Sequence, residues 1–389
     1  MARHASGVVI VFGRRRNGLA VQPAPLLAQY PLFPSACNRG TVLWMNRTAR
    51  SCLIVALALC AAPLPPVPVA QAQESEEAGF QGYLQLLASR ARAQGVSEQT
   101  IVRMTQGLTF NPRVIALDRA QPGGSTATPA PFAPYRRAHV DVARIERGRA
   151  MYRSAADVVP RIERQYGVPA QIMLAIWGNE TNYGSYSGDF DLARSLATLA
   201  YEGRRRAMFA DEFIALLKMV DRGVPRERLK GSWAGAFGNP QFLPSVYLRL
   251  AADGDGDGDR DIWGSRADTL ASIANYFRDA GWRSGEPWGV AASVSATLDR
   301  SLVATRLNSP VCARVHARYS TWRTVGEWRR MGVQALAPIG ENVQATLFEP
   351  DGPDAPAYLL TGNYRVILQY NCSNYYALSV GLLADEIAH

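Results

Sequence analysis

One carboxylate in this chain is suited to acid catalysis. Glu180 follows an almost wholly apolar run, and Pro169 is well placed at the first position of a helix that we predict to run towards Gly184. At helical spacing, Ile172, Ile176 and Glu180 share one stripe. Such a carboxyl is desolvated, so its raised pKa keeps it protonated near neutral pH, ready to protonate a leaving oxygen. The alternative is a helix-end glutamate that turns to solvent or caps an amide.

A second group of acids lies in one short loop. Asp253, Asp255, Asp257 and Asp261 have the spacing of positions one, three, five and nine of an EF-hand calcium loop. Gly264 stands at position twelve, where that loop has a bidentate glutamate. A solvated Asp-Gly turn is the alternative. Five clustered carboxylates would repel one another without a cation, so the pattern favours a structural calcium ion.

Four segments, in order and at similar spacing, resemble one family. They are the Glu180 segment, the glycine-rich segment Gly231–Ser245, the aspartate loop and Ala274-Asn-Tyr-Phe277. Together they resemble the membrane-bound lytic murein transglycosylase B family, glycoside hydrolase family 103. The similarity extends from Phe80 to His389. It implies a mainly α (α+β) fold, with a lysozyme-like helical core, an N-terminal helical lobe and a small β-containing lobe.

The resemblance implies cleavage of the β-1,4 bond between N-acetylmuramic acid and N-acetylglucosamine in peptidoglycan. Glu180 would protonate the leaving oxygen and then act as base on the muramic 6-hydroxyl, giving a 1,6-anhydro product without a catalytic cofactor. An ordinary glycosidase needs a second carboxylate, and Asp189, Asp191 and Glu202 lie in segments that do not suggest one. A hydrolytic muramidase and a wall-binding scaffold with a silent glutamate are the alternatives.

The resemblance also assigns residues around the glutamate. Ser232 and Gln241 flank glycines that would let the backbone approach a sugar, with Pro240 starting a helix at the cleft. Without the resemblance we would expect a tight turn there, core aromatics and a solvated helix face. The substrate contacts implied are Ser232, Gln241, Tyr276, Tyr370 and Asn371, with Arg205 and Arg206 for stem-peptide carboxylates, and the calcium ligands are Asp253, Asp255, Asp257, Asp261 and Asp268.

The charge of the chain is concentrated at its beginning. The formal charge is +9, but residues 1–72 hold seven arginines and no acid, which leaves 35 basic and 33 acidic residues, or +2, for residues 73–389. Without a basic stripe, nucleic-acid binding is excluded. A basic start after Met45, a short apolar run and a small-residue site at Ala70–Ala72 predict a signal peptide and the periplasm of a Gram-negative bacterium. Lipid attachment at Cys60 is the less favoured alternative.

The remaining chain divides by its pattern. We predict an upstream segment with the signal peptide over 1–72, a helical lobe over 73–166, a catalytic core over 167–288 and 371–389, and a β-containing lobe over 289–370. Strand-like segments include Val290–Leu298 and Tyr364–Tyr370. Cys312 and Cys372 either pair or remain buried thiols. The expected partners are glycan strands, stem peptides and a wall-remodelling complex, bound by a monomer.

Overall fold

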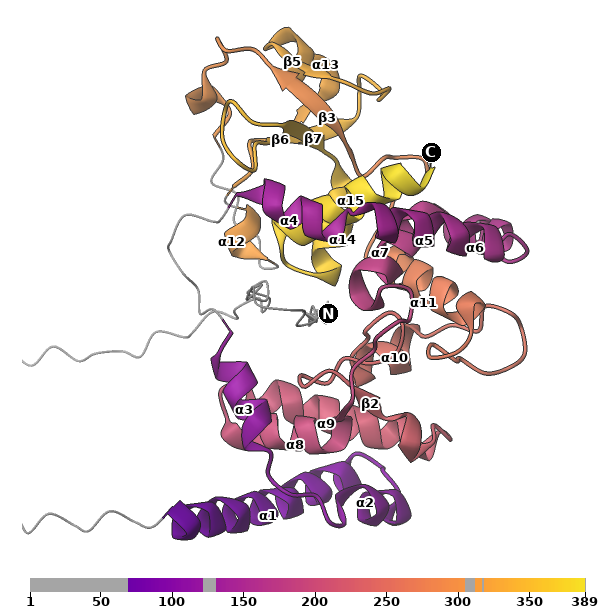
Figure 1. Cartoon of the computed structure of the whole chain (residues 1–389), viewed down its shortest axis with the longest axis vertical. Coiled ribbons are helices and arrows are strands. Elements are labelled where there is room, and N and C mark those ends of the chain that lie inside the picture. Colours follow the sequence, from indigo (N-terminus) through magenta and orange to yellow (C-terminus); the bar gives the residue numbers. More distant parts are fainter. Residues whose placement is uncertain (1–68, 122–130, 305–311, 317, 389) are drawn as a thin grey trace, which may run out of the picture.

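The computed structural model describes residues 69–121, 131–304, 312–316 and 318–388, and it is mainly helical with a small sheet, as predicted (Figure 1). The predicted signal peptide lies almost entirely outside these residues, as do Met45 and Cys60. No helix in the described part is long and apolar enough to cross a membrane. The longer helices are α1 (Val69–Ala93), α2 (Glu98–Thr105), α3 (Pro112–Arg119), α4 (Phe132–His139), α5 (Val142–Ser154), α6 (Val159–Tyr166), α7 (Ala170–Thr181), α8 (Leu192–Glu202), α9 (Arg206–Asp221), α10 (Pro244–Leu250), α11 (Arg266–Asp279), α14 (Gly362–Tyr370) and α15 (Asn374–Ala388).

The helices before α7 form two groups, where we predicted one lobe over 73–166. Helices α1 to α3 pack on α8 and α9, in the lower part of Figure 1. There the ring of Phe80 meets the ring of Tyr201 at 5.8 Å. Helices α4 and α5 pack instead on α15, where Phe132 meets Tyr375 at 5.2 Å, and α6 packs on α11. The apolar residues of each group therefore complete a different part of the helical body.

A five-stranded antiparallel sheet forms the β-containing part. Its order is β4-β6-β7-β3-β5, and its own small core contains Trp328 and Leu347. Tyr364–Tyr370, expected to be extended, is instead helix α14: the Thr361 side chain caps its first turn, and buried Tyr364 and Ile367 share a helical face. The helix packs in the main core, so the sheet region ends at Leu360. The strands are β3 (Gly289–Val294), β4 (Arg323–Thr324), β5 (Val333–Ala335), β6 (Gln344–Phe348) and β7 (Ala357–Leu360), beside the short helices α12 (Ala313–His316) and α13 (Val325–Arg330).

Helix α7 carries Glu180 through the middle of the helical body. It begins at Ala170, one residue later than predicted, because Pro169 has extended backbone (ψ 140°) and precedes the first turn. Nearly every residue of α7 is buried, and α5, α11 and α15 surround it. It ends at Thr181, where Asn182 and Tyr183 both have left-handed backbone (φ 51° and 58°). The chain thus turns away directly after Glu180.

One covalent cross-link joins the two parts of the fold. Cys312 and Cys372 form a disulfide with a Cα–Cα distance of 5.3 Å and a sequence separation of 60 residues. Of the two alternatives for these cysteines, the structure has the pair. Cys372 lies in the short connector between α14 and α15.

Candidate active site

Glu180 is a buried carboxyl with one hydrogen-bond donor. Its side chain is 4% exposed, and Oε1 accepts a hydrogen bond of 2.5 Å from the hydroxyl of Tyr376. Burial raises the pKa of Glu180 to about 8, against the smaller lowering effect of that bond. Oε2 has no partner among the described residues. Burial therefore favours the protonated form of Glu180 near neutral pH, and the solvent-facing alternative is wrong.

Tyr376 was not among the predicted site residues. It lies on α15, 196 residues after Glu180, and is fully buried. No spacing rule connects two helices so far apart in sequence. The available signal was a phenol among the apolar residues of the C-terminal segment, because a buried tyrosine hydroxyl needs a partner.

Two buried amide side chains, in the segments that meet at Tyr370, have unused hydrogen-bonding atoms. Gln241 and Asn371 are each 2% exposed, and Gln241 Oε1 and Asn371 Nδ2 have no partner among the described residues. The residues that precede these two amides in the sequence are in contact, because the hydroxyl of Tyr370 donates to the backbone carbonyl of Pro240. Charge on Glu180 also raises the pKa of Tyr370, so the acid is close by. One free acceptor and one free donor match the N–H and C=O of an acetamido group.

The glycine-rich segment is a tight turn before a helix. Ser232 Oγ accepts from the backbone N–H of Ala236 at 2.9 Å, so it holds the turn from inside. We had expected Pro240 to start a helix, and this is wrong. Gln241 has left-handed backbone (φ 51°), which ends the turn, and α10 begins at Pro244. The amide of Gln241 donates to two backbone carbonyls, which fixes its side chain.

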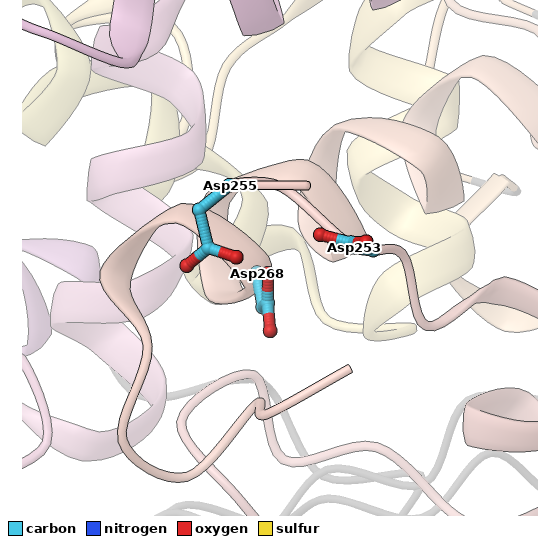
Figure 2. Close-up of side chains that lie close together, drawn as sticks. All are labelled: Asp253, Asp255 and Asp268. Carbon is cyan, nitrogen blue, oxygen red and sulfur yellow. The ribbon is translucent and has the colours of Figure 1, made fainter. Parts of the chain in front are cut away.

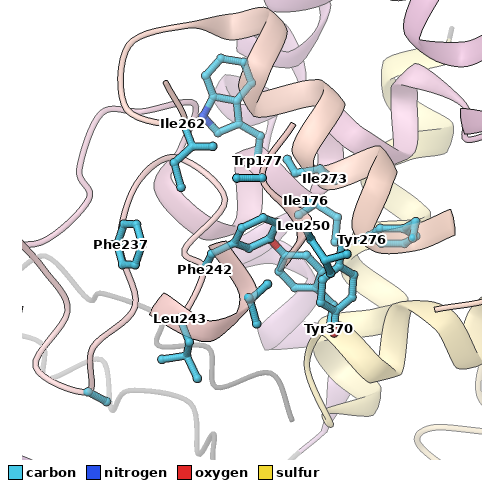
Figure 3. Packing of buried hydrophobic residues seen from close by; sticks show 14 of the residues in the cluster. Ile176, Trp177, Phe237, Phe242, Leu243, Leu250, Ile262, Ile273, Tyr276 and Tyr370 are labelled. Atoms are coloured by element: carbon cyan, nitrogen blue, oxygen red, sulfur yellow. The ribbon is translucent and has the colours of Figure 1, made fainter. Parts of the chain in front are cut away.

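Tyr276 and Tyr370 lie inside the apolar core next to the site (Figure 3). Their rings meet at 4.7 Å, and each hydroxyl donates to a backbone carbonyl. Both side chains are at most 4% exposed. Their rings therefore support the floor of the site and present little surface for stacking on a sugar.

Arg205 and Arg206 connect α9 to the helices before it. Arg205 pairs with the buried carboxylate of Asp118 on α3 and lies 4.7 Å from the ring centre of Phe209. Arg206 lies 5.0 Å from the ring centre of Tyr83 on α1. Arg206 is exposed, so it is the freer of the two to meet a stem-peptide carboxylate.

The other acids considered at the site are engaged elsewhere or exposed. Asp191 caps α8 and pairs with Arg226. Glu202 accepts from the backbone N–H of Arg204, and Asp189 is exposed. Among the described residues, no neighbouring acid contributes to the raised pKa of Glu180.

The aspartate loop brings three carboxylates together (Figure 2). Oxygen atoms of Asp253, Asp255 and Asp268 all lie within 4.8 Å of one another. Asp268 is fully buried, and its pKa is raised to about 6, chiefly by burial and further by its two acidic neighbours. Asp257 and Asp261 are not part of this group. Asp261 pairs with Arg228 at 3.1 Å and accepts two backbone N–H groups, and Asp257 accepts the backbone N–H of Asp259. Carboxylate oxygens are the donors that calcium prefers, and these three would supply part of its usual six to eight ligands.

A helical scaffold with one buried acid beside unused amide groups defines a class of glycan-cleaving proteins, and sequence comparison identifies the family. Residues 79–385 match the family described as the transglycosylase SLT domain, so the chain belongs to that family. This confirms the predicted relationship and the lysozyme-like fold class.

Individual relatives agree with this assignment. Membrane-bound lytic murein transglycosylase B of Escherichia coli is 29% identical over 257 residues, which cover 65% of this chain and 66%, just under two thirds, of that protein. SltB3 from Pseudomonas aeruginosa, solved in complex with NAG-NAM-pentapeptide, is 39% identical with a TM-score of 0.71 and 79% of each chain covered. Escherichia coli Slt35, solved in complex with calcium, is 27% identical with a TM-score of 0.64, covering 80% of this chain and 93% of that one.

Proposed function

We propose that this protein is a lytic transglycosylase that cleaves the MurNAc–GlcNAc bond of peptidoglycan and forms 1,6-anhydroMurNAc. The observation that carries the proposal is the buried Glu180, whose pKa is raised by burial and on which no second acid of the described residues acts. A lone carboxyl can protonate the leaving oxygen, but it has no partner to activate water or to attack the sugar.

The proton position follows from the contacts of the carboxyl. Oε1 accepts from Tyr376, so the proton resides on Oε2 and is donated from there to the glycosidic oxygen. The carboxylate left behind is stabilised by the same Tyr376 hydroxyl. It then removes the proton of the muramic 6-hydroxyl, whose oxygen attacks the anomeric carbon and closes the anhydro ring.

The surrounding residues suit an N-acetylated sugar that carries a peptide. Gln241 and Asn371 would bind an acetamido group, and Arg206, with Arg205 behind it, would meet the stem-peptide carboxylates. A relative solved with NAG-NAM-pentapeptide supports this substrate class. Export to the periplasm through residues 45–72 would bring the enzyme to its substrate.

Calcium would have a structural role in this proposal. Asp253, Asp255 and Asp268 would hold the ion, which neutralises their mutual repulsion and fixes the loop before α11. A calcium-bound structure of a relative supports the choice of metal.

The product decides the reaction type. Purified peptidoglycan digested with the protein is expected to give fragments that end in anhydroMurNAc, which mass spectrometry distinguishes by the absence of one water. Reducing muramic ends would instead identify a hydrolytic muramidase. A digest without soluble fragments would leave only a wall-binding role.

A further inference from the structure

The connector between α14 and α15, residues 371–373, leads directly into the helix that carries Tyr376. It contains Asn371, whose buried amide nitrogen has no partner among the described residues, and Ser373, whose Oγ accepts from the backbone N–H of Tyr376. Tyr376 in turn donates to Glu180. The backbone of residues 371–373 thus positions both a proposed substrate contact, Asn371, and Tyr376, the hydrogen-bond partner that Glu180 has among the described residues.

A segment from the β-containing part holds this connector. The disulfide ties Cys372 to Cys312, and the hydroxyl of Tyr319 donates to the Asn374 side chain. Tyr319 is 3% exposed, so this bond is inside the protein. The next residue, Ser320, exchanges two hydrogen bonds with the backbone of Leu347 on β6. The connector is therefore anchored to the sheet and not only to the helices on either side.

From this arrangement we infer that the Cys312–Cys372 disulfide is a positioning element of the active site: it fixes the connector so that Tyr376 stays on Glu180 and Asn371 keeps its position. The inference rests on the proposed role of Glu180. Neither cysteine touches the reacting groups, so the disulfide acts through Tyr376 and Asn371.

The groups around Glu180 make this role measurable by pH. The titratable groups that face the acid are Tyr376 from α15, Tyr370 from α14 and Tyr135 from α4, and burial raises the pKa of all three, so they remain neutral in the working range. Arg144 on α5 acts on Tyr135 and not on Glu180. The hydrogen bond from Tyr376 is the contact that lowers the pKa of Glu180, so losing that contact raises it.

The experiment measures kcat/KM against pH on soluble, uncrosslinked glycan strands. Cleavage needs protonated Glu180, so wild-type activity falls as pH rises through about 8. Tyr376→Phe is expected to move this alkaline limb up by about one to two pH units, the size of a hydrogen bond to a charged group. Cys312→Ser/Cys372→Ser should move it in the same direction and lower kcat by about 3- to 10-fold. Adding Tyr376→Phe to the cysteine variant should give no shift beyond that of Tyr376→Phe alone.

Two further variants separate positioning from general loss of stability. Tyr319→Phe keeps the disulfide and removes one anchor of Asn374, so it tests the connector even if the cysteine variant folds poorly; a smaller upward shift is expected. Trp328→Phe is the matched control, because it weakens the core of the sheet without touching the connector, and it should leave the limb unchanged.

A wild-type pH profile in both the cysteine variant and Tyr319→Phe would overturn the inference, as would an unshifted limb in Tyr376→Phe. The proposed function fails differently: the wild-type protein would then release no anhydroMurNAc ends at any pH.

Discussion

Glu180 and Asp268 are both buried acids, and the fold surrounds them differently. Glu180 receives one hydrogen bond, from a phenol, and ends an apolar stripe. Asp268 receives two from backbone N–H groups, each at 2.6 Å, and has two further carboxylates beside it. A carboxyl with one neutral donor is stable when protonated and can exchange that proton. At Asp268 the two backbone donors favour the anion while burial and the neighbouring acids disfavour it, so a bound cation would offset the repulsion.

The largest effect expected from this comparison is on catalysis. Glu180→Gln preserves shape but cannot deliver a proton, so turnover of purified peptidoglycan should fall about 10²-fold or more. Glu212→Gln is the matched control, because Glu212 is also a buried acid with a raised pKa, but it binds Ser245 at the start of α10. Near-normal turnover in Glu180→Gln would show that Glu180 is not the catalytic acid.

The same substitution should stabilise the fold near neutral pH. The pKa of Glu180 is about 8 in the folded state and near 4.5 when unfolded, so the folded state holds an extra proton between these values. Wild-type stability contributed by this proton is full below pH 4.5 and is lost as pH rises through 8. At pH 7 the group costs of the order of 3 kcal/mol relative to a neutral side chain. Denaturant unfolding should show Glu180→Gln gaining on wild type from pH 5 to 8, and parallel curves would contradict the buried-acid description.

At Asp268 the next largest effect is expected on thermal stability, when the cation is added or removed. If calcium binds Asp253, Asp255 and Asp268, chelation should lower the melting temperature, and calcium at 100 times its dissociation constant should restore about 2.7 kcal/mol. Asp268→Asn should remove the calcium dependence while the anhydro product stays the same. Identical melting curves for the metal-free and calcium-loaded wild type would favour a plain Asp-Gly turn.

The smallest effects are expected at acids outside both sites. Asp189→Asn, Asp191→Asn and Glu202→Gln, made singly, should leave the anhydro product unchanged and alter rates only a few-fold through packing. A loss of about 10²-fold in one of them, together with reducing ends from the wild type, would instead indicate a water-activating base.

The contrast also separates what local sequence can and cannot predict. The burial of Glu180 follows from the repeat of Ile172 and Ile176, because helical periodicity fixes which side chains share a face. Its partner Tyr376 does not, because their contact depends on how α7 and α15 pack. The aspartate spacing indicated the loop, but Asp261 turns away since Arg228 and backbone N–H groups bind it.

Short segments show a second limit. Tyr364–Tyr370 has too few residues for its apolar pattern to distinguish a strand from a helix, and tertiary packing decided for the helix. The pairing of Cys312 with Cys372 likewise depends on a distance between Cα atoms that sequence separation does not contain.

The long sequence interval between Glu180 and Tyr376 has a consequence for the stage of folding at which the site becomes active. As the chain emerges, α7 appears well before α15, which later covers it. Until then Glu180 lacks the hydrogen bond from Tyr376 and the cover of α15, and the missing burial leaves its pKa closer to the ordinary value of a carboxyl. We therefore expect a chain truncated before Asn374 to lack a catalytically competent Glu180. The site is complete only when the C-terminal helix α15 has packed on α7.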